Sequence, residues 1–290
     1  MEEDIYLVVG ATGGCGYHIT KELISRGKRV SIVIRDHNKA QKLFKDIWDK
    51  FEGVYVIDFT KEHWNKDIIH AIEDSKGVIS YVISNLAATS DTDVKEMYMY
   101  NYEINRRLIY AFKKIPLKNF VFISSFLTDN PSHHIAKRIN KYRFNSLGYK
   151  NLVEVYLKLS GLRYTIIRPG KLEEFEDSQP SYFEVKQDDK VPGFITRATV
   201  GKAVADFLET NTNNVQFEIL TNKDKLKEPY INPFPEYNFK TYDLKHTLIH
   251  NHKGVQIFEK YNTFCLSTMF IGFFLKFTVH VFRRYKINRI

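Results

Sequence analysis

A run of glycines follows directly on the first apolar segment and limits what this chain can fold into. Residues 5–9 read Ile-Tyr-Leu-Val-Val, which is typical of a buried β-strand, and Gly10, Gly13 and Gly16 follow at intervals of three. Glycine permits a tight turn, lets a diphosphate approach the backbone, and lets a helix pack closely on the strand. The helix predicted at 17–26 would direct free N–H groups at a phosphate. We therefore expect a dinucleotide site here; the alternative is a glycine turn without a ligand.

Apolar runs and amphipathic segments alternate along the first 220 residues. Strands are predicted at 30–34, 53–57, 77–83, 119–123, 162–168 and 215–220, and helices at 38–49, 147–160 and 197–209. Strands separated by helices form βαβ units, so the pattern predicts an α/β fold with a doubly wound parallel sheet covered on both faces. Residues 172–195 contain Pro180 and Pro192 and are predicted to be loop-like.

The end of the second predicted strand indicates which dinucleotide the chain prefers. Arg35 comes first there and Asp36 second. An arginine suits the 2′-phosphate of NADP, whereas an acid suits the ribose of NAD, so we expect NADP in preference to NAD. Asp36 is interpreted as a helix cap or as a partner of Arg35. Asp58, after the third strand, is placed to meet the adenine or to cap a helix.

Several segments together resemble the atypical short-chain dehydrogenase/reductases, in their NmrA-like, NAD(P)-binding branch. They are residues 10–16, 33–36, Asp58, Ser124-Ser125 and 160–170, which read Ser-Gly-Leu-Arg-Tyr-Thr-Ile-Ile-Arg-Pro-Gly. The resemblance covers about residues 4–220. It implies a Rossmann-type sheet with the nicotinamide near Ser124-Ser125 and Pro169-Gly170. The residues then expected to bind the cofactor are Gly10, Thr12, Gly13, Gly14, Cys15, Gly16, Arg35, Asp58, Ser84, Ser124, Lys150, Pro169 and Gly170.

The same resemblance predicts a catalytic group that this chain carries only in part. Reductases of the wider family use a tyrosine as proton donor, a lysine four residues later and a serine that polarises the substrate carbonyl. Lys150 matches the lysine and Ser125 or Ser124 the serine, but Ser146 stands at the tyrosine position. Tyr142 and Tyr149 do not share the helix face of Lys150. Lys150 is therefore a cofactor ribose ligand or a solvated lysine, and the two serines bind substrate or have a structural role.

Other candidate sites are interpreted as structural. Cys15 is either a redox-active thiol at a helix N-terminus or, as we favour, a small residue that fits the turn. His133 and His134 lack nearby ligands at metal spacing, so no metal is expected. The basic residues between 137 and 143 are interpreted as a solvated face, and no nucleic acid is expected as a partner. Two cysteines cannot form a disulfide framework, which indicates a reducing compartment, and the acids Glu2, Glu3 and Asp4 argue against a signal peptide.

The excess positive charge lies mostly at the C-terminal end. The formal net charge is +9, and residues 261–290 hold five basic residues and no acid, which leaves 9 − 5 = +4 for residues 1–260. Of the 19 residues in 264–282, 13 are apolar, and a polar stripe recurs every four residues from Thr268 to Arg284. The segment 264–286 is predicted to lie on a membrane or to span it. The alternative is a helix docked on the rest of the chain.

These patterns divide the chain into an NAD(P)-binding domain at 1–222, which includes a lid region at 172–196, an irregular extension at 223–260 and a hydrophobic, basic helix at 261–290. The missing tyrosine and the apolar tail favour a non-catalytic NADP(H)-binding subunit of a membrane-associated complex, such as one of the respiratory chain. The mitochondrial inner membrane is then favoured over the cytoplasm or a plastid, with other subunits as partners. The alternatives are an NADPH-dependent oxidoreductase acting on a small carbonyl or lipid-like substrate, and an NADP(H) redox sensor.

Overall fold

Eight strands pair into one sheet in the order β3-β2-β1-β4-β5-β6-β10-β8. The computed structural model describes residues 4–75, 77–88, 92–174, 179–187 and 192–242. All neighbouring strands of the sheet are parallel except β8, which runs antiparallel to β10. The strands are β1 (Ile5–Val9), β2 (Arg29–Ile34), β3 (Phe51–Val56), β4 (Ile79–Ser84), β5 (Asn119–Ile123), β6 (Tyr164–Pro169), β8 (Glu184–Lys186) and β10 (Val215–Leu220). The predicted α/β fold with a doubly wound parallel sheet is confirmed.

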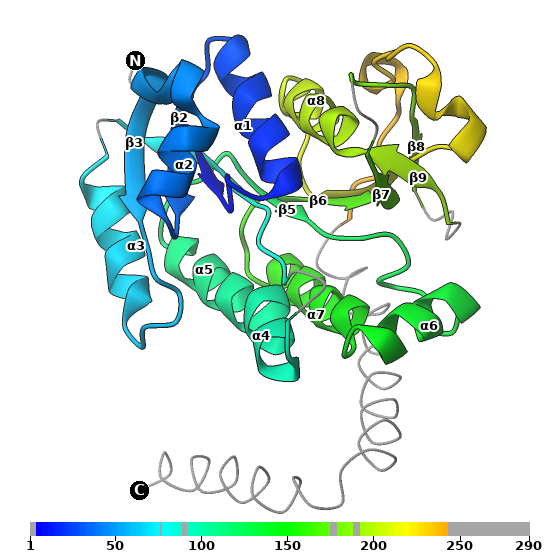
Figure 1. Ribbon diagram of the computed structural model, residues 1–290, viewed down its shortest axis with the longest axis horizontal. Coiled ribbons are helices and arrows are strands. Elements are labelled where there is room, and N and C mark those ends of the chain that lie inside the picture. Colours follow the sequence, from blue (N-terminus) through cyan, green and yellow to red (C-terminus); the bar gives the residue numbers. More distant parts are fainter. Residues whose placement is uncertain (1–3, 76, 89–91, 175–178, 188–191, 243–290) are drawn as a thin grey trace, which may run out of the picture. The chain divides into compact units, whose positions relative to one another are not determined.

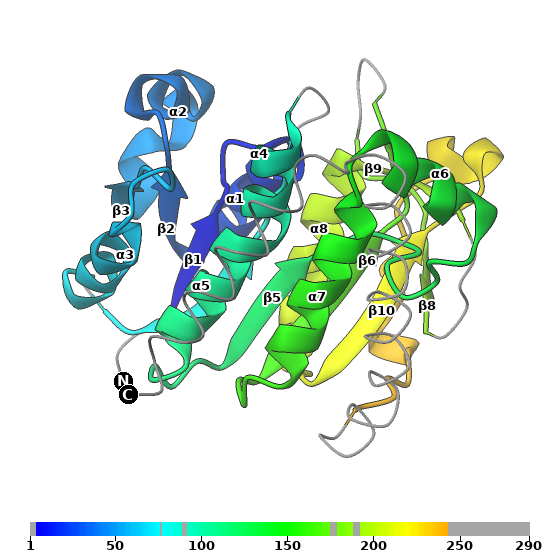
Figure 2. The ribbon, with the colours of Figure 1, turned by 90° about the horizontal axis from the view of Figure 1, so that it is seen from below.

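Helices cover both faces of this sheet (Figures 1 and 2). One face carries α1 (Gly14–Ser25), α2 (His37–Leu43) and α8 (Arg197–Leu208). The other carries α3 (Trp64–Glu73), α4 (Val94–Tyr98), α5 (Ile104–Phe112) and α7 (Ser146–Lys158). A π-helical turn at Met99–Glu103 joins α4 to α5, and α6 (His134–Tyr142) precedes α7. Short 3₁₀ helices lie at Lys45–Lys50, Lys223–Lys227 and Phe234–Glu236.

Alternate residues of each strand enter two different cores. In β1, Val8 packs with α1 and α8, whereas Leu7 and Val9 pack on the opposite face. Central parallel strands are therefore apolar on both sides, because side chains alternate across a sheet that helices cover twice. This explains why β1 appears in the sequence as an uninterrupted apolar run.

The segment predicted to be loop-like at 172–195 contains short strands, so that prediction was wrong. Besides β8, β7 (Lys171–Glu173) and β9 (Phe194–Thr196) form a separate parallel pair. Strands of three residues are too short to show an alternating pattern, and tertiary pairing alone fixes them. The single helix predicted at 38–49 is likewise divided, since α2 ends at Leu43 and a 3₁₀ helix follows.

The hydrophobic tail predicted at 264–286 lies outside the described residues, as does the part of the predicted extension from 243 to 260. Among the helices that the structure does describe, none is long and apolar enough to cross a membrane.

The order of the strands reverses between β1 and β4, and α1 begins at this point. A Cβ atom on Gly16 would lie 2.2 Å from the carbonyl oxygen of Gly10, so α1 can approach the end of β1 only because residue 16 is glycine. Gly10 itself has φ of +83°, a backbone conformation that favours glycine. In open α/β sheets, ligands bind outside the carboxyl ends of the strands where the strand order reverses.

We predict that Gly16→Ala lowers the free energy of unfolding by roughly 1–3 kcal/mol or more, because the new methyl group meets backbone that cannot rotate away. Gly53→Ala is the matched control, since its nearest contacts are atoms at the end of the Tyr55 side chain. Urea unfolding followed by circular dichroism measures both variants. Equal stability of Gly16→Ala and the wild-type chain would contradict the predicted contact.

Candidate cofactor site

The glycine turn forms a shallow cradle at the carboxyl end of β1. The Gly13 N–H donates to the Gly10 carbonyl at 3.1 Å, and α1 begins at Gly14. Gly13 and Gly14 are exposed and Thr12 is half-buried, so the first turn of α1 faces outward. The first N–H groups of a helix have no partner within it and suit an anion. The arrangement fits the diphosphate of a dinucleotide, as the glycine spacing predicts.

Asn85 completes this cradle, and the sequence analysis missed it. Its backbone N–H donates to the Val9 carbonyl at 2.9 Å. Its side-chain nitrogen would lie 3.3 Å from a Cβ atom on Gly13 and 3.0 Å from one on Gly16. Its position in the sequence could have indicated this role, because Asn85 directly follows β4, the strand next to β1.

Cys15 is buried beneath the turn. Burial raises the pKa of its thiol to about 11 and outweighs the cations nearby. A thiol with this pKa is protonated at neutral pH and is a poor nucleophile. The structure therefore favours the interpretation of Cys15 as a small residue that fits the turn over that of a redox-active thiol.

Arg35 and Asp58 follow β2 and β3, which are neighbours in the sheet. The exposed Arg35 guanidinium donates to the Tyr100 hydroxyl at 2.7 Å and lies over the Tyr100 ring. Asp36 caps α2 by accepting a bond from the Lys39 N–H at 3.0 Å, so its helix-cap interpretation is confirmed. Bonds from Thr60 to Asp58 lower the pKa of that carboxyl group, with a smaller effect from Arg35. Arg35 is thus placed at the strand end where a 2′-phosphate is expected.

The hydroxyl groups of two predicted cofactor residues are held by other side chains. Ser84 is fully buried and donates to Asn105 Oδ1 at 2.6 Å. Ser124 is 6% exposed and donates to the Glu154 carboxylate. Among the serines predicted near the nicotinamide, Ser125 is the half-buried one. The Ser124 N–H also donates to the Ile167 carbonyl at 2.8 Å, so both the side chain and the backbone of Ser124 serve to hold the end of β5 in place.

Close-packed backbone lies where the nicotinamide is expected, at the ends of β5 and β6. The Phe126 N–H donates to the Pro169 carbonyl at 3.0 Å, which joins the segment after β5 to the end of β6. A Cβ atom on Gly170 would lie 2.7 Å from the Gly193 carbonyl oxygen. Pro169 and Gly170 therefore lie beside Ser124-Ser125, as predicted, with the segment before β9 directly against them.

Lys150 extends from α7 to the end of β5. Its Nζ atom donates to the carbonyl oxygens of Ile123 and Ser124 at 3.0 and 3.2 Å. Burial lowers the pKa of the ammonium group to about 8, and Cys15 is among its electrostatic neighbours. Lys150 is therefore not a solvated helix lysine, and it lies close to the glycine turn. Ser146, at the tyrosine position, is only 8% exposed, while Tyr142 ends α6 and is 69% exposed.

A buried ion pair beneath Ser124 was not predicted from the sequence. Arg168 of β6 donates to the fully buried Glu154 of α7 from Nε at 3.1 Å and from Nη2 at 2.6 Å. Nη1 of Arg168 also donates to Asp129 at 2.8 Å, and the Thr128 hydroxyl donates to Glu154 at 2.8 Å. These bonds compensate two charges that would be costly to bury alone, and they fix α7 against the ends of β5 and β6.

Burial changes the protonation of Glu218, which lies in β10 next to β6. It raises the pKa of this carboxyl group to about 7, an effect that the Arg168 charge only partly offsets. Glu218 is 4% exposed, so the protonated form is favoured in the folded chain over a range of pH in which the unfolded chain is ionised.

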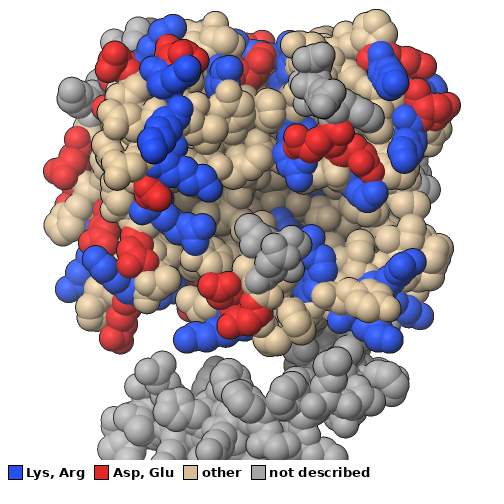
Figure 3. All heavy atoms as spheres, viewed as in Figure 1, with Lys and Arg blue, Asp and Glu red and all other residues tan. Residues whose placement is uncertain are grey.

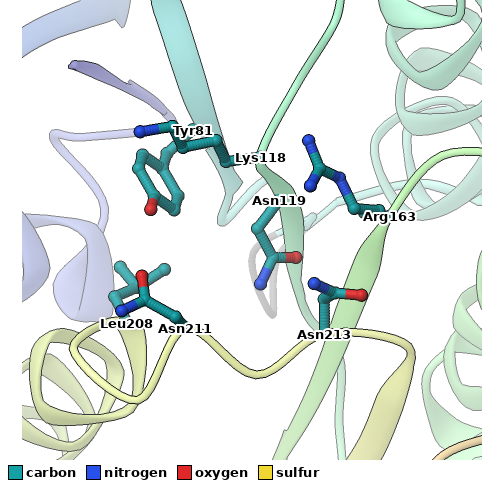
Figure 4. Close-up of a pocket in the computed structure, with 7 residues that line it drawn as sticks. All are labelled: Tyr81, Lys118, Asn119, Arg163, Leu208, Asn211 and Asn213. Carbon is teal, nitrogen blue, oxygen red and sulfur yellow. The ribbon is translucent and has the colours of Figure 1, made fainter.

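The face that holds the glycine turn is hollowed near its centre, with acidic and basic side chains around the hollow (Figure 3). A separate hollow of about 200 Å³ lies among Tyr81, Lys118, Asn119 and Arg163 (Figure 4). Asn119 begins β5 and Arg163 directly precedes β6, so this second hollow is at the amino end of the strands. It is thus at the opposite edge of the sheet from the glycine turn.

The described residues contain no cluster of acidic, histidine or cysteine side chains that could hold a metal ion. His133 and His134 stack on each other, and the His133 ring accepts a bond from the Ile135 N–H at the start of α6. The basic residues nearby are exposed, namely Lys137, Arg138, Lys141 and Arg143.

This chain is similar in sequence to a known protein family and to several named proteins. The model of a family described as NAD(P)H-binding matches residues 10–211. Protein TIC 62, chloroplastic, of Arabidopsis thaliana is 25% identical over 275 residues, which cover 84% of this chain and 42% of that protein. Divinyl chlorophyllide a 8-vinyl-reductase, chloroplastic, of Cucumis sativus is 26% identical over 185 residues, which cover 60% of this chain and 42% of the relative. The chain thus spans about two-fifths of the length of these relatives.

Solved structures share the fold. An anaerobillin reductase of Escherichia coli O157:H7 superposes with a TM-score of 0.60 at 20% identity, covering 74% of this chain and 96% of that one. A short-chain dehydrogenase/reductase of Veillonella parvula in complex with NADP gives a TM-score of 0.56 at 14% identity, covering 79% of this chain and 99% of that one. Similarity at this level of identity supports the Rossmann-type fold.

We predict that Glu218→Gln changes the dependence of stability on pH. Because the folded-state pKa is raised to about 7 from an ordinary value of 4.5, the stabilising effect of Glu218 is complete below about pH 4.5 and is lost as the pH rises towards 7. The variant, which carries no such group, should gain roughly 3 kcal/mol relative to the wild-type chain between pH 5 and pH 8. Urea unfolding at both pH values measures this gain. A difference that does not change with pH would contradict the prediction.

Proposed function

The chain belongs to the NAD(P)H-binding family, and from this membership we propose that it is an NADPH-dependent oxidoreductase that reduces a small carbonyl or lipid-like substrate. The observation that carries the proposal is the position of Lys150. Its ammonium group lies at the carboxyl end of β5, close to the glycine turn, with a pKa lowered to about 8. A proton donor is thus present beside the expected cofactor although Ser146 replaces the tyrosine.

The residues at the strand ends support NADPH as the cofactor. The glycine turn offers backbone N–H groups to a diphosphate, and Arg35 offers a planar cation to a 2′-phosphate. One carboxylate oxygen of Asp36 caps α2, so Asp36 already has a structural role that needs no ribose contact. The structural relative from Veillonella parvula, which was solved with NADP, is consistent with this preference.

Reduction of a carbonyl requires a hydride at carbon and a proton at oxygen. Bound NADPH would supply the hydride. Lys150 would hold the proton, because two of its ammonium hydrogens are directed at the Ile123 and Ser124 carbonyls and the third remains for a substrate oxygen. A donor with a pKa of about 8 is largely protonated at neutral pH and readily gives up its proton.

Exposed aromatic side chains near the start of α7 support a substrate with an apolar part. Tyr142, the last residue of α6, is 69% exposed, and Phe144, in the connection between α6 and α7, is 40% exposed. Tyr98 of α4, 37% exposed, contacts Tyr149 of α7 edge to face. Aromatic surface of this kind favours ligands that bury apolar area.

The hypothesis of a non-catalytic respiratory-chain subunit has less support. The two relatives compared above are both named as chloroplastic proteins, and one is named as a reductase. Membrane contact through 264–286 and assembly with other subunits remain predictions from the sequence, because those residues lie outside the described ones. The mitochondrial location likewise remains a prediction.

Arg35→Ala should raise the Kd for NADPH roughly tenfold and leave the Kd for NADH nearly unchanged, because only NADPH carries the 2′-phosphate. Quenching of protein fluorescence by each nucleotide measures both constants. Lys39→Ala, which removes a neighbouring exposed cation from α2, is the matched control. An equal loss of affinity for the two nucleotides would contradict the proposed role of Arg35.

Lys150→Met should lower kcat for NADPH oxidation by roughly 100-fold or more across a panel of aromatic and aliphatic aldehydes and ketones. In the wild-type chain, kcat should fall as the pH rises through about 8, because the ammonium group then loses its proton. Absorbance at the NADPH band follows both reactions. A wild-type chain that binds NADPH but reduces none of these substrates would favour the non-catalytic alternative, and a fully active Lys150→Met variant would exclude the lysine as donor.

A further inference from the structure

Arg197 lies directly on the glycine turn although it is far from it in sequence. A Cβ atom on Gly14 would come within 2.5 Å of Arg197 Cδ and 2.6 Å of its Nε atom. Residue 14 must therefore be small for the arginine to lie where it does. The charge of Arg197 also acts on Cys15 and His18, which places it over the first turn of α1.

The position of Arg197 is fixed by the packing of α8 on α1. A Cβ atom on Gly201 would lie 2.6 Å from the His18 carbonyl carbon, so the two helices touch through their backbones. Arg26, directly after α1, pairs with Asp206 of α8 at the far end of the same contact. The backbone of Arg197 is therefore fixed by this helix contact, and its guanidinium group can move only as far as the length of the side chain allows.

Positive charge converges at this point. Arg197 is the first residue of α8, where the helix dipole is positive, and its side chain lies at the positive end of α1 as well. A cation at a helix N-terminus is unfavourable unless an anion compensates it. The carboxylate that pairs with it is Glu174, which is 61% exposed. An ion pair this exposed contributes little stability, so a stronger anion can replace Glu174 at small cost.

We propose that Arg197 binds the diphosphate of the dinucleotide, and that Glu174 competes with the diphosphate for the same guanidinium group. The inference rests on the proposed function, since it concerns the same site. On binding, Arg197 exchanges one carboxylate for two phosphates and adds a planar pair of donors to the N–H groups of α1. Glu174 thereby sets the affinity for the cofactor, because its release from Arg197 is part of cofactor binding.

Three ligands separate this contact from the one made by Arg35. NADPH carries both a diphosphate and a 2′-phosphate, NADH carries the diphosphate without the 2′-phosphate, and 2′-AMP carries the 2′-phosphate without the diphosphate. Arg197→Gln should raise the Kd for NADPH and for NADH roughly tenfold and leave that for 2′-AMP unchanged. Lys202→Gln removes a charge from the same helix one turn further along and should change none of the three.

Glu174→Gln should lower the Kd for NADPH roughly threefold, because it removes the competitor. The same change made in the Arg197→Gln chain should have no effect, since the group for which it competes is absent. Arg197→Lys keeps the positive charge but loses the planar pair of N–H donors, so it should bind NADPH with intermediate affinity. Thermal unfolding of each variant verifies that the chain is folded before its affinity is measured.

Failure of the proposed function and failure of this inference would give different results. A wild-type chain that binds neither NADPH nor NADH overturns the proposed function. A folded Arg197→Gln variant that binds NADPH as tightly as the wild-type chain overturns this inference alone, as does an equal loss of 2′-AMP affinity. A Glu174→Gln variant with unchanged or weaker NADPH binding overturns the competition between carboxylate and diphosphate.

Discussion

The close approach of α1 to the end of β1 is the contact on which the cofactor site depends. It exists because no side chain separates Gly16 from the Gly10 carbonyl oxygen, where a Cβ atom would lie only 2.2 Å away. This contact brings the N-terminus of α1 to the edge of the sheet at the point where strand order reverses. Because α8 packs backbone to backbone on α1 at Gly201, the same contact also sets where Arg197 lies. Two small residues, Gly16 and Gly201, thus position elements that are far apart in the sequence.

The opposite side of the site depends on buried charge. Glu154 accepts bonds from Arg168, Thr128 and Ser124, so α7 is fixed to the ends of β5 and β6. Removing either partner of the Arg168–Glu154 pair would leave the other charge buried and uncompensated. The pair explains why the Ser124 hydroxyl turns inward. It also explains why Lys150, one helical turn before Glu154, reaches the Ile123 and Ser124 carbonyls.

The sequence predicts those parts of the molecule that depend on local patterns. Strand β1 occupies 5–9 and β5 occupies 119–123 as predicted, because a buried parallel strand is a continuous apolar run. The glycine turn and Arg35 were also found, since each follows a strand directly. The inward bonds of Ser84 and Ser124, and the placement of Arg197, depend on contacts between distant segments. No single-sequence pattern encodes such contacts, and the three-residue strands β7 and β9 were missed for the same reason.

In the proposed reaction, Lys150 takes the place of the tyrosine that Ser146 replaces. In the wider family a lysine lowers the pKa of a phenol so that the phenol can transfer a proton. Here burial has already lowered the pKa of Lys150 to about 8, nearer to neutrality than a free phenol at about 10. An ammonium group in this position can transfer the proton itself, and it does so best when no solvent competes for its hydrogens. The buried serine at position 146 is therefore compatible with a reductase that uses one fewer group, provided that its substrate covers Lys150 from water.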